Sequence, residues 1–208
     1  MVESRCGLKC SECTYRESMN CAGCLAIDNP FWGECEIKNC CEAKGHSHCG
    51  GCSQIPCDNL TAFAFEGDES DNGTRIEHCK TWATEGFFSP TQFVQDMASR
   101  NAAALKEHFT PGAVIRWLDS REEFTPEEYI RANCEYPGQW QGKLQKVEKL
   151  AQADNLVMIT QISSGKLAFN ITSFIKLQQG KIAQLEEYYS ECGEPPQWRK
   201  DMKVGKPI

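Results

Sequence analysis

In the second half of the chain, apolar side chains recur first at helical spacing. Ser89-Pro90 has the form of an N-cap followed by proline at the first helical position, and it opens a helix predicted to run to about His108. Thr125-Pro126, followed by two glutamates, predicts a further helix that ends near Asn133. Both helices precede the long strand-like runs.

Those runs have the length and alternation of β-strands. The predicted strands are residues 113–118, 143–152, 155–163, 166–178 and 181–190. Asp154-Asn155, Ser164-Gly165 and Gln179-Gly180 separate the last four at hairpin distances. This order predicts an α+β fold, in which a curved antiparallel sheet wraps into a cone-shaped barrel with helices and leaves a pocket at its open mouth.

The first half has much weaker hydrophobic periodicity. Its first 60 residues have the character of loops punctuated by Cys pairs, Gly and Pro, and only residues 74–85, stopped by Gly86, are predicted to be helical. Leu, Ile, Val and Phe number 13 in residues 1–88, which is too few for an ordinary core. Two domains are therefore predicted: a small Cys-rich, metal-stabilised domain over residues 1–88, and the α+β cone with a C-terminal tail over residues 89–208.

The cysteines predict metal binding in the first domain. Twelve of the 14 lie between Cys6 and Cys79, and three C-x-x-C pairs occur among them. A C-x-x-C turn places two thiolates on one tetrahedral metal, so two such turns close a four-sulfur site. About two structural zinc ions are predicted, with these ligands: Cys10, Cys13, Cys21 and Cys24 for one site, and Cys35, Cys40, Cys49 and Cys52 for the other. Metal binding would supply folding free energy that the small core lacks.

The assignment of ligands stays open at several positions. Cys6 and Cys57 are the first candidates to replace a ligand, while Cys41, His46 and His48 lie nearby and could also serve. The simpler interpretation of the two histidines is that they are exposed loop residues. An iron–sulfur cluster is an alternative to zinc, because it too takes four thiolates.

Charge argues against nucleic acid as a partner. Residues 1–88 carry 7 Lys/Arg against 14 Asp/Glu, whereas residues 89–208 carry 15 of each. Each four-thiolate zinc site would add further negative charge, and phosphate contacts need the opposite sign. No stretch is apolar enough to cross a membrane, and the first residues lack the apolar segment of a secretory signal. We therefore expect a cytoplasmic protein, where thiols stay reduced and disulfides are rare.

Amphipathic side chains gather between residues 115 and 140 and in the last predicted strand. The candidate pocket residues are Trp117, Glu122, Asn133, Tyr136, Trp140 and Glu187. They predict a small-molecule pocket with aromatic walls and one or two buried acids. The alternative for any one of them is a core with a polar rim and solvated glutamates.

The cysteine pattern also resembles a known family. The segments that carry the resemblance are Cys6-Gly7-x2-Cys10-x2-Cys13, Cys21-Ala22-Gly23-Cys24, Cys35-x4-Cys40 and Cys49-x2-Cys52-x3-Pro56-Cys57. Over residues 4–85 the chain resembles a Cys-rich prokaryotic domain family of unknown function. The resemblance implies zinc binding, but it does not indicate what the domain does. Cys41 and the His-Ser-His before Cys49 depart from the pattern.

Residues 89–200 resemble a second family, the SnoaL-like branch of the nuclear-transport-factor-2-like superfamily. The segments that carry it include Trp117-Leu118-Asp119, Glu128-Tyr129-Ile130-x-Ala132-Asn133, Tyr136-Pro137-Gly138-x-Trp140, Glu187-Tyr188 and Pro195-Pro196-x-Trp198-Arg199. This resemblance implies a cystatin-like cone, and it allows a homodimer through the sheet face. The superfamily includes polyketide cyclases, isomerases, dehydratases and non-catalytic binding domains, so the fold alone does not give the function.

Two functions follow from these observations. The first is a zinc-binding protein whose SnoaL-like domain binds a small apolar or mixed-polarity molecule. The alternative is an isomerase- or cyclase-type enzyme, in which Glu122 or Glu187 acts as general base and Asn133 or Tyr136 steadies a developing enolate oxygen. No histidine follows Phe109, so the Asp–His pair of the cyclases cannot be built from the pocket strands.

Overall fold

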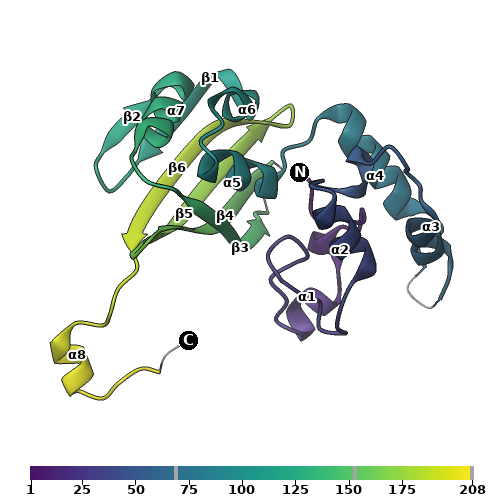
Figure 1. Ribbon diagram of the computed structural model, residues 1–208, viewed down its shortest axis with the longest axis horizontal. Helices are drawn as coiled ribbons and strands as arrows, with labels where there is room; N and C mark the ends of the chain where they lie inside the picture. Colours follow the sequence, from purple (N-terminus) through teal and green to yellow (C-terminus); the bar gives the residue numbers. More distant parts are fainter. Residues whose placement is uncertain (68–69, 152–153, 207–208) are drawn as a thin grey trace.

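The computed structural model describes residues 1–67, 70–151 and 154–206 of the chain. The sheet and its helices form one part, and the Cys-rich half lies beside it (Figure 1). A short helix near the C-terminus, α8 (Gln197–Asp201), extends away from both (Figure 1). The ends of the predicted strand 143–152 and of the predicted tail lie at residues outside the described ranges.

One six-stranded sheet forms the second half. Its strands are β1 (Phe109–Trp117), β2 (Glu122–Phe124), β3 (Gln141–Lys149), β4 (Asn155–Ser164), β5 (Leu167–Gln178) and β6 (Lys181–Glu191). The spatial order is β2-β1-β6-β5-β4-β3, and all neighbours are antiparallel except β1 and β6, which run parallel. The meander from β3 to β6 confirms the predicted α+β cone.

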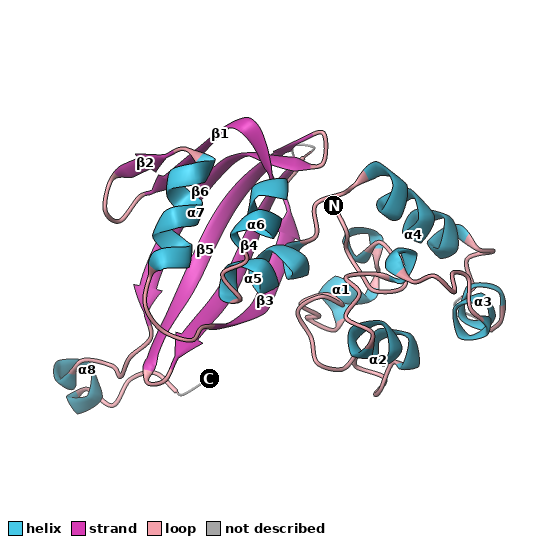
Figure 2. Cartoon of the chain, turned by 45° about the horizontal axis from the view of Figure 1, so that its top comes forward, coloured by secondary structure: helices cyan, strands magenta, loops and turns pink. Residues whose placement is uncertain are grey.

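Three helices cover one face of this sheet: α5 (Pro90–Ala98), α6 (Ala102–Glu107) and α7 (Pro126–Glu135) (Figure 2). The core lies between helices and sheet, where Phe93, Leu105 and Tyr129 meet Ile115 and Leu185, all fully buried. Burial of side chains of this size contributes roughly 1.5–3 kcal/mol each, so this core is the main source of stability for the cone.

Local sequence explains where these elements start and turn. Ser89 accepts a hydrogen bond from the amide of Gln92 and caps α5, as predicted. Thr125 and Glu128 form a capping box at the start of α7. Asp154 and Gly165 both adopt positive φ at their hairpins, which is the backbone that such tight turns require.

Two boundaries differ from the prediction. The helix expected to run to about His108 breaks after Ala98, because Arg100 adopts positive φ and the Asn101 side chain caps α6. Strand β1 starts at Phe109, before the predicted residue 113, and its pairing with β6 is irregular until Val114. Pro111 lies in this irregular stretch, where the missing amide donor disturbs the ladder.

The Cys-rich half contains more helix than its sequence suggests. Its α-helices are α1 (Tyr15–Ser18), α2 (Glu36–Ala43), α3 (Asp58–Phe65) and α4 (Thr74–Glu85), with short 3₁₀ turns at Cys10–Glu12 and Cys49–Gly51. Only α4, followed by Gly86 at positive φ, was predicted. A small core holds these helices together, and its buried members are Cys6, Ile37, Leu60, Ala64 and Ile76.

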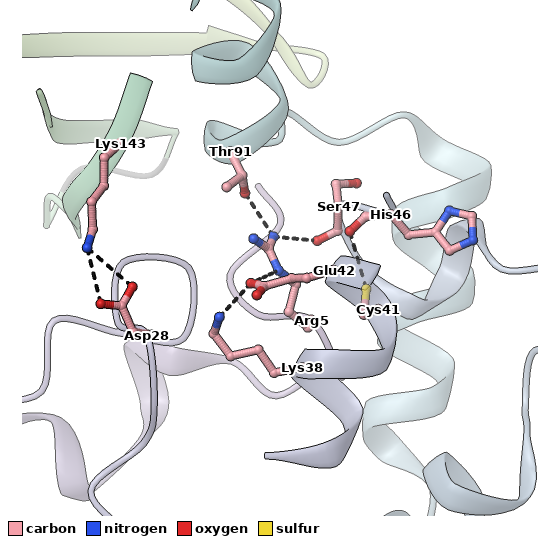
Figure 3. A network of polar contacts seen from close by, with 9 residues as sticks. All are labelled: Arg5, Asp28, Lys38, Cys41, Glu42, His46, Ser47, Thr91 and Lys143. Atoms are coloured by element: carbon pink, nitrogen blue, oxygen red, sulfur yellow. Dashed lines mark hydrogen bonds and ion pairs between the residues drawn. The ribbon is translucent and has the colours of Figure 1, made fainter. Parts of the chain in front are cut away.

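The two halves make direct contacts. Leu25, only 9% exposed, belongs to the hydrophobic core of the cone, although it directly follows Cys24. The buried guanidinium of Arg5 donates to Glu42, to the carbonyl of Ser47 and, across the boundary, to Thr91 at the start of α5 (Figure 3). The halves are therefore joined by packing and by polar contacts.

Strand β3, at the edge of the sheet, carries much of this contact. Arg16 donates to the main-chain carbonyl of Val147 and pairs with Glu148 at 3.0 Å. Lys143 pairs with Asp28 at 3.2 Å (Figure 3). The Cys-rich half thus lies along the outer strand. Within the described ranges, none of the helices is long and apolar enough to cross a membrane.

Candidate functional site

A cavity of about 290 Å³ opens between α5, α7 and the ends of the strands. Five aromatic side chains line it: Trp117, Tyr136, Trp140, Phe169 and Tyr189. The remaining lining residues are Met97, Ala98, Ala132, Asn133 and Ile162. Its volume is near the lower end of the range for small-molecule sites, which are typically concave and mostly apolar.

The register of the sheet brings part of the wall together. Ile162 of β4 lies opposite Phe169 of β5, so both side chains meet at one end of the sheet. Trp117 and Tyr189, from the parallel pair β1 and β6, have ring centroids 5.4 Å apart. Trp140, in the segment between α7 and β3, lies 6.3 Å from Phe169. The cavity is therefore built by the neighbouring strands β1, β6, β5 and β4 together with the segment after α7.

Glu187 lies behind this wall and is fully buried. Trp117 and Ser173 are its direct neighbours in the two adjacent strands, and each donates to the carboxylate at 3.0 Å. The hydroxyls of Tyr189 and Tyr129 donate at 3.1 and 3.4 Å. Each oxygen of the carboxylate thus accepts two hydrogen bonds.

Burial and hydrogen bonding act on Glu187 in opposite directions. Burial disfavours the ionised form and raises the pKa of the carboxyl above its usual value of 4.5, and the four donors offset only part of that rise. The same burial, together with the nearby Glu187 carboxylate, raises the pKa of Tyr129. Both groups are therefore fully buried, and each pKa rises because burial disfavours the ionised form.

The structure places the predicted pocket residues in three different ways. Trp117, Asn133, Tyr136 and Trp140 line the cavity. Glu187 does not line it, but fixes two residues that do. Glu122 lies outside, exposed on the short edge strand β2.

Some residues of the wall were not singled out from the sequence. Phe169 is far from the other candidates in the chain, and no local signal marks it. Tyr189 could have been found, because it lies two residues after Glu187 and strand side chains of that spacing share a face.

A second, shallower groove adjoins the cavity. It has a volume of about 570 Å³ and shares Ala132 and Tyr136 with the cavity. Its charged lining residues are Glu122, Glu123, Glu128, Glu135 and Arg131. The mouth of the cavity is therefore flanked by a surface with an excess of carboxylates.

The first predicted set of metal ligands is partly assembled. The main-chain amide of Cys24 donates to the sulfur of Cys10 at 3.5 Å, so these two residues are in contact. Burial raises the pKa of the Cys10 thiol to about 12. Cys13 and Cys21 both line an open hollow on the adjacent surface.

The second set is grouped differently from the prediction. A small cavity of about 20 Å³ is lined by Cys40, Cys49 and Cys52, as expected, and also by Cys41, Cys57 and His46. Cys35 does not line it and packs instead against the small core that contains Cys6. The alternative ligands named from the sequence are thus nearer to this cavity than Cys35 is.

These sulfur atoms fit zinc in kind and in number, but they do not converge. Across residues 1–67, 70–151 and 154–206, no three His, Cys, Asp or Glu side chains are arranged to hold one metal ion. In the same ranges every cysteine is a free thiol. Thiolate ligands are the donors that zinc prefers in structural sites, so the chemistry of the set remains suitable.

Comparison with known proteins agrees with both resemblances. Residues 14–62 match the model of a family described as "Protein of unknown function (DUF3795)". No curated protein matches the chain.

Several solved structures are similar to the second half. A proposed ketosteroid isomerase from Kribbella flavida has 19% identity over 56% of this chain and 86% of its own, with a TM-score of 0.48. An NTF-2-like protein of unknown function from Burkholderia xenovorans has 17% identity over 56% of this chain and 91% of its own, with a TM-score of 0.47. A proposed SnoaL-like polyketide cyclase from Jannaschia has 13% identity over 47% and 80%, with a TM-score of 0.41.

Proposed function

We propose that the cone binds a small molecule, largely apolar or of mixed polarity, in the aromatic cavity. The observation that carries the proposal is the cavity itself, in which five aromatic rings surround a space of about 290 Å³. Apolar walls with few polar groups are typical of sites that bind small ligands by burial. Asn133 and the Tyr136 hydroxyl are the polar groups that could orient such a ligand.

Binding is favoured over proton transfer by the position of the carboxylates. A general base must reach the proton that it removes, directly or through one water. Both oxygens of Glu187 already accept two hydrogen bonds each from protein donors, behind the Trp117 and Tyr189 side chains. Glu122 is exposed in the adjoining groove. The isomerase or cyclase alternative therefore has no carboxylate in the cavity wall as described.

The test is binding of a neutral apolar dye, N-phenylnaphthylamine, whose fluorescence rises in an apolar site. The full chain should bind it with saturation. Ala132→Leu, on α7, adds bulk inside the cavity and should weaken binding at least several-fold. Ala103→Leu, at an exposed position of α6, is the matched control and should bind as the parent does.

Two results would contradict the proposal. One is an absence of saturable binding by the parent protein. The other is an equal loss of binding in the Ala132→Leu and Ala103→Leu variants, since that would locate the dye elsewhere.

We infer that the Cys-rich half binds about two zinc ions as structural centres. The support is the density of thiols in a half with a small core, together with the contact of Cys10 with Cys24 and the cysteine-lined cavity near Cys49. Bound zinc would supply folding free energy and a fixed geometry, and four protein ligands leave no position for catalysis.

Metal analysis of protein purified without added chelator tests this inference. We expect about two zinc ions per chain and a lower content in Cys10→Ser and Cys49→Ser variants. Cys192→Ser, at the end of β6 and outside the Cys-rich half, is the control. Iron together with inorganic sulfide would instead indicate an iron–sulfur cluster.

Three further properties belong to the same proposal. We expect the protein in the cytoplasm, where its thiols stay reduced. Pairing of two cones through the sheet face would give a homodimer, and sedimentation would detect it. No binding of DNA or RNA is expected at moderate salt, because the Cys-rich half is acidic.

A further inference from the structure

Three of the aromatic side chains in the cavity wall donate their polar hydrogens to acceptors within the protein. The indole N–H of Trp117 and the hydroxyl of Tyr189 both donate to Glu187, at 3.0 and 3.1 Å. A ring whose polar hydrogen donates to a carboxylate is polarised by it, which increases the electron density of the ring. These two aromatic side chains therefore offer a ligand electron-rich carbon surface and no donor.

The opposite wall shows the same arrangement. The indole N–H of Trp140 donates to the carbonyl of Pro137 at 3.0 Å. The amide nitrogen of Asn133 donates to the carbonyl of Tyr129 at 2.9 Å, and its oxygen accepts none of the hydrogen bonds found in the described part of the chain. Asn133 thus keeps an acceptor oxygen and one amide hydrogen, and the Tyr136 hydroxyl is the other polar group of the wall. An anionic ligand would find few donors here.

The groove beside the mouth of the cavity has an excess of acidic side chains, while Arg100 lies at the rim and donates to the Tyr136 and Gly138 carbonyls. Four glutamates and one arginine line the groove that shares Ala132 and Tyr136 with the cavity. Glu123 is paired with Arg116, Glu135 with Arg131, and Glu128 with its own helix cap. Glu122 has no such partner in the ranges that the structure describes, so its charge is the one most open to a ligand.

From this combination we propose that the ligand of the cavity is an alkylated ammonium cation, with its methyl or methylene groups among the aromatic rings and its charge balanced by their π faces and by the carboxylates at the mouth. The inference rests on the proposed function, since it names the chemical class of the molecule that occupies the same cavity. Such a cation has apolar substituents and donates few hydrogen bonds or none, which matches a wall of mostly carbon with only Asn133 and the Tyr136 hydroxyl as polar groups.

Other ligand classes fit less well. An anion is repelled by the mouth and finds few donors inside. A neutral molecule with several polar groups loses most of its hydrogen bonds to water, because only Asn133 and the Tyr136 hydroxyl can replace them. A neutral apolar molecule matches the wall but gains nothing from the excess of carboxylates. The cation is the class for which cavity and mouth act together.

A pair of probes of the same shape tests the inference. Choline carries a quaternary nitrogen, and its neutral isostere has a carbon atom in that place. Both are titrated into the full chain at low salt, and affinity is measured by calorimetry and by displacement of N-phenylnaphthylamine. We expect choline to bind about tenfold tighter or better, the size of difference that cation–π contacts give in desolvated sites.

Two variants locate the effect. Trp140→Leu keeps an apolar wall but removes one ring, and it should reduce the preference for the cation several-fold while the neutral isostere binds almost as before. Trp198→Leu, on the exposed helix α8, is the matched control and should change neither affinity. Glu122→Gln should weaken choline alone, and added salt should reduce that difference.

The outcomes separate this inference from the proposed function. A neutral isostere that binds as tightly as choline overturns the choice of a cation and leaves the proposed cavity function intact. Binding of neither probe, while the dye still binds and is weakened by Ala132→Leu, also overturns the choice of a cation alone. Absence of saturable dye binding overturns both. A preference for choline that is undiminished in Trp140→Leu would also overturn the inference, because the charge would then be recognised elsewhere.

Discussion

The indole of Trp117 donates its hydrogen bond to Glu187 across 3.0 Å, and the two residues are direct partners in the parallel pair β1 and β6. One bond therefore fixes a ring of the cavity wall and satisfies part of a fully buried carboxylate. The wall and the interior beneath it cannot be changed independently.

Replacing this donor should be costly. Trp117→Phe leaves one oxygen of Glu187 with a single donor, and we expect the free energy of unfolding to fall by about 1–3 kcal/mol. Trp140→Phe is the control, because its indole donates to a carbonyl at the exposed rim. Urea denaturation measures both. Equal losses in the two variants would show that the contact with Glu187 carries no special weight.

The raised pKa of Glu187 predicts a pH dependence of stability. A carboxyl whose pKa is higher in the folded state keeps its proton longer there than in the unfolded chain. Its contribution to stability is therefore present at low pH and is lost as pH rises from about 4.5 through the folded pKa.

Glu187→Gln isolates that contribution. The difference in unfolding free energy between parent and variant should decrease from pH 4 to pH 8. A constant difference, or one that increases with pH, would show that the carboxyl titrates in the folded protein as it does in the unfolded chain.

Arg5 should couple the two halves. Its side chain is only 5% exposed and reaches Glu42, the Ser47 carbonyl and Thr91. Arg5→Met should lower stability by about 2–4 kcal/mol, since it leaves several buried acceptors unpaired. Arg131→Met, which breaks an exposed pair on α7, should leave the free energy of unfolding almost unchanged.

A double-mutant cycle of Arg5→Met with Thr91→Val isolates the contact between the halves. A coupling energy of about 0.5 kcal/mol or more is expected for residues in direct contact. Strict additivity would mean that the hydrogen bond between these two side chains contributes no stability.

Leu25 belongs to the Cys-rich half, but its side chain should stabilise the cone, because it packs into the core of the cone. Leu25→Ala removes a side chain from the core of the cone and should cost about 2–3 kcal/mol. Leu150→Ala, at a position 44% exposed, is the control and should stay within about 0.5 kcal/mol. Hydrogen exchange of β3 amides should rise in the first variant only. Unchanged exchange there would show that the cone does not depend on Leu25.

The hairpins of the sheet were predictable because local chemistry sets them. Gly165 and Gly180 adopt positive φ where the strand runs pause, and the register then follows from short turns. The break after Ala98 was not predictable, because apolar spacing continues across it and only the Asn101 cap marks it. The helices of the Cys-rich half show weak hydrophobic periodicity in the sequence. They pack around a small core that includes a buried cysteine, so they do not need long apolar faces.

The site was predicted as a region more successfully than as a set of chemical roles. Trp117 and Trp140 are conspicuous amphipathic residues, and the fold brings them to one cavity. The roles of Glu122 and Glu187 depended on which way each side chain points at a particular strand position. For Glu187, the role depends on the parallel pairing of β1 with β6, which places the residue beside Trp117. No short-range signal in the sequence predicts that pairing.

The position of the Cys-rich half along β3 has a consequence for the life of the protein in a cell. An outer strand with unpaired main-chain groups is a template for strand addition by another chain. Arg16 occupies one such group, the carbonyl of Val147, and the neighbouring ion pairs hold the covering half in place. Oxidation of the thiols, or loss of the zinc proposed above, would uncover the template if it loosened this cover, and the sheet would then be expected to aggregate.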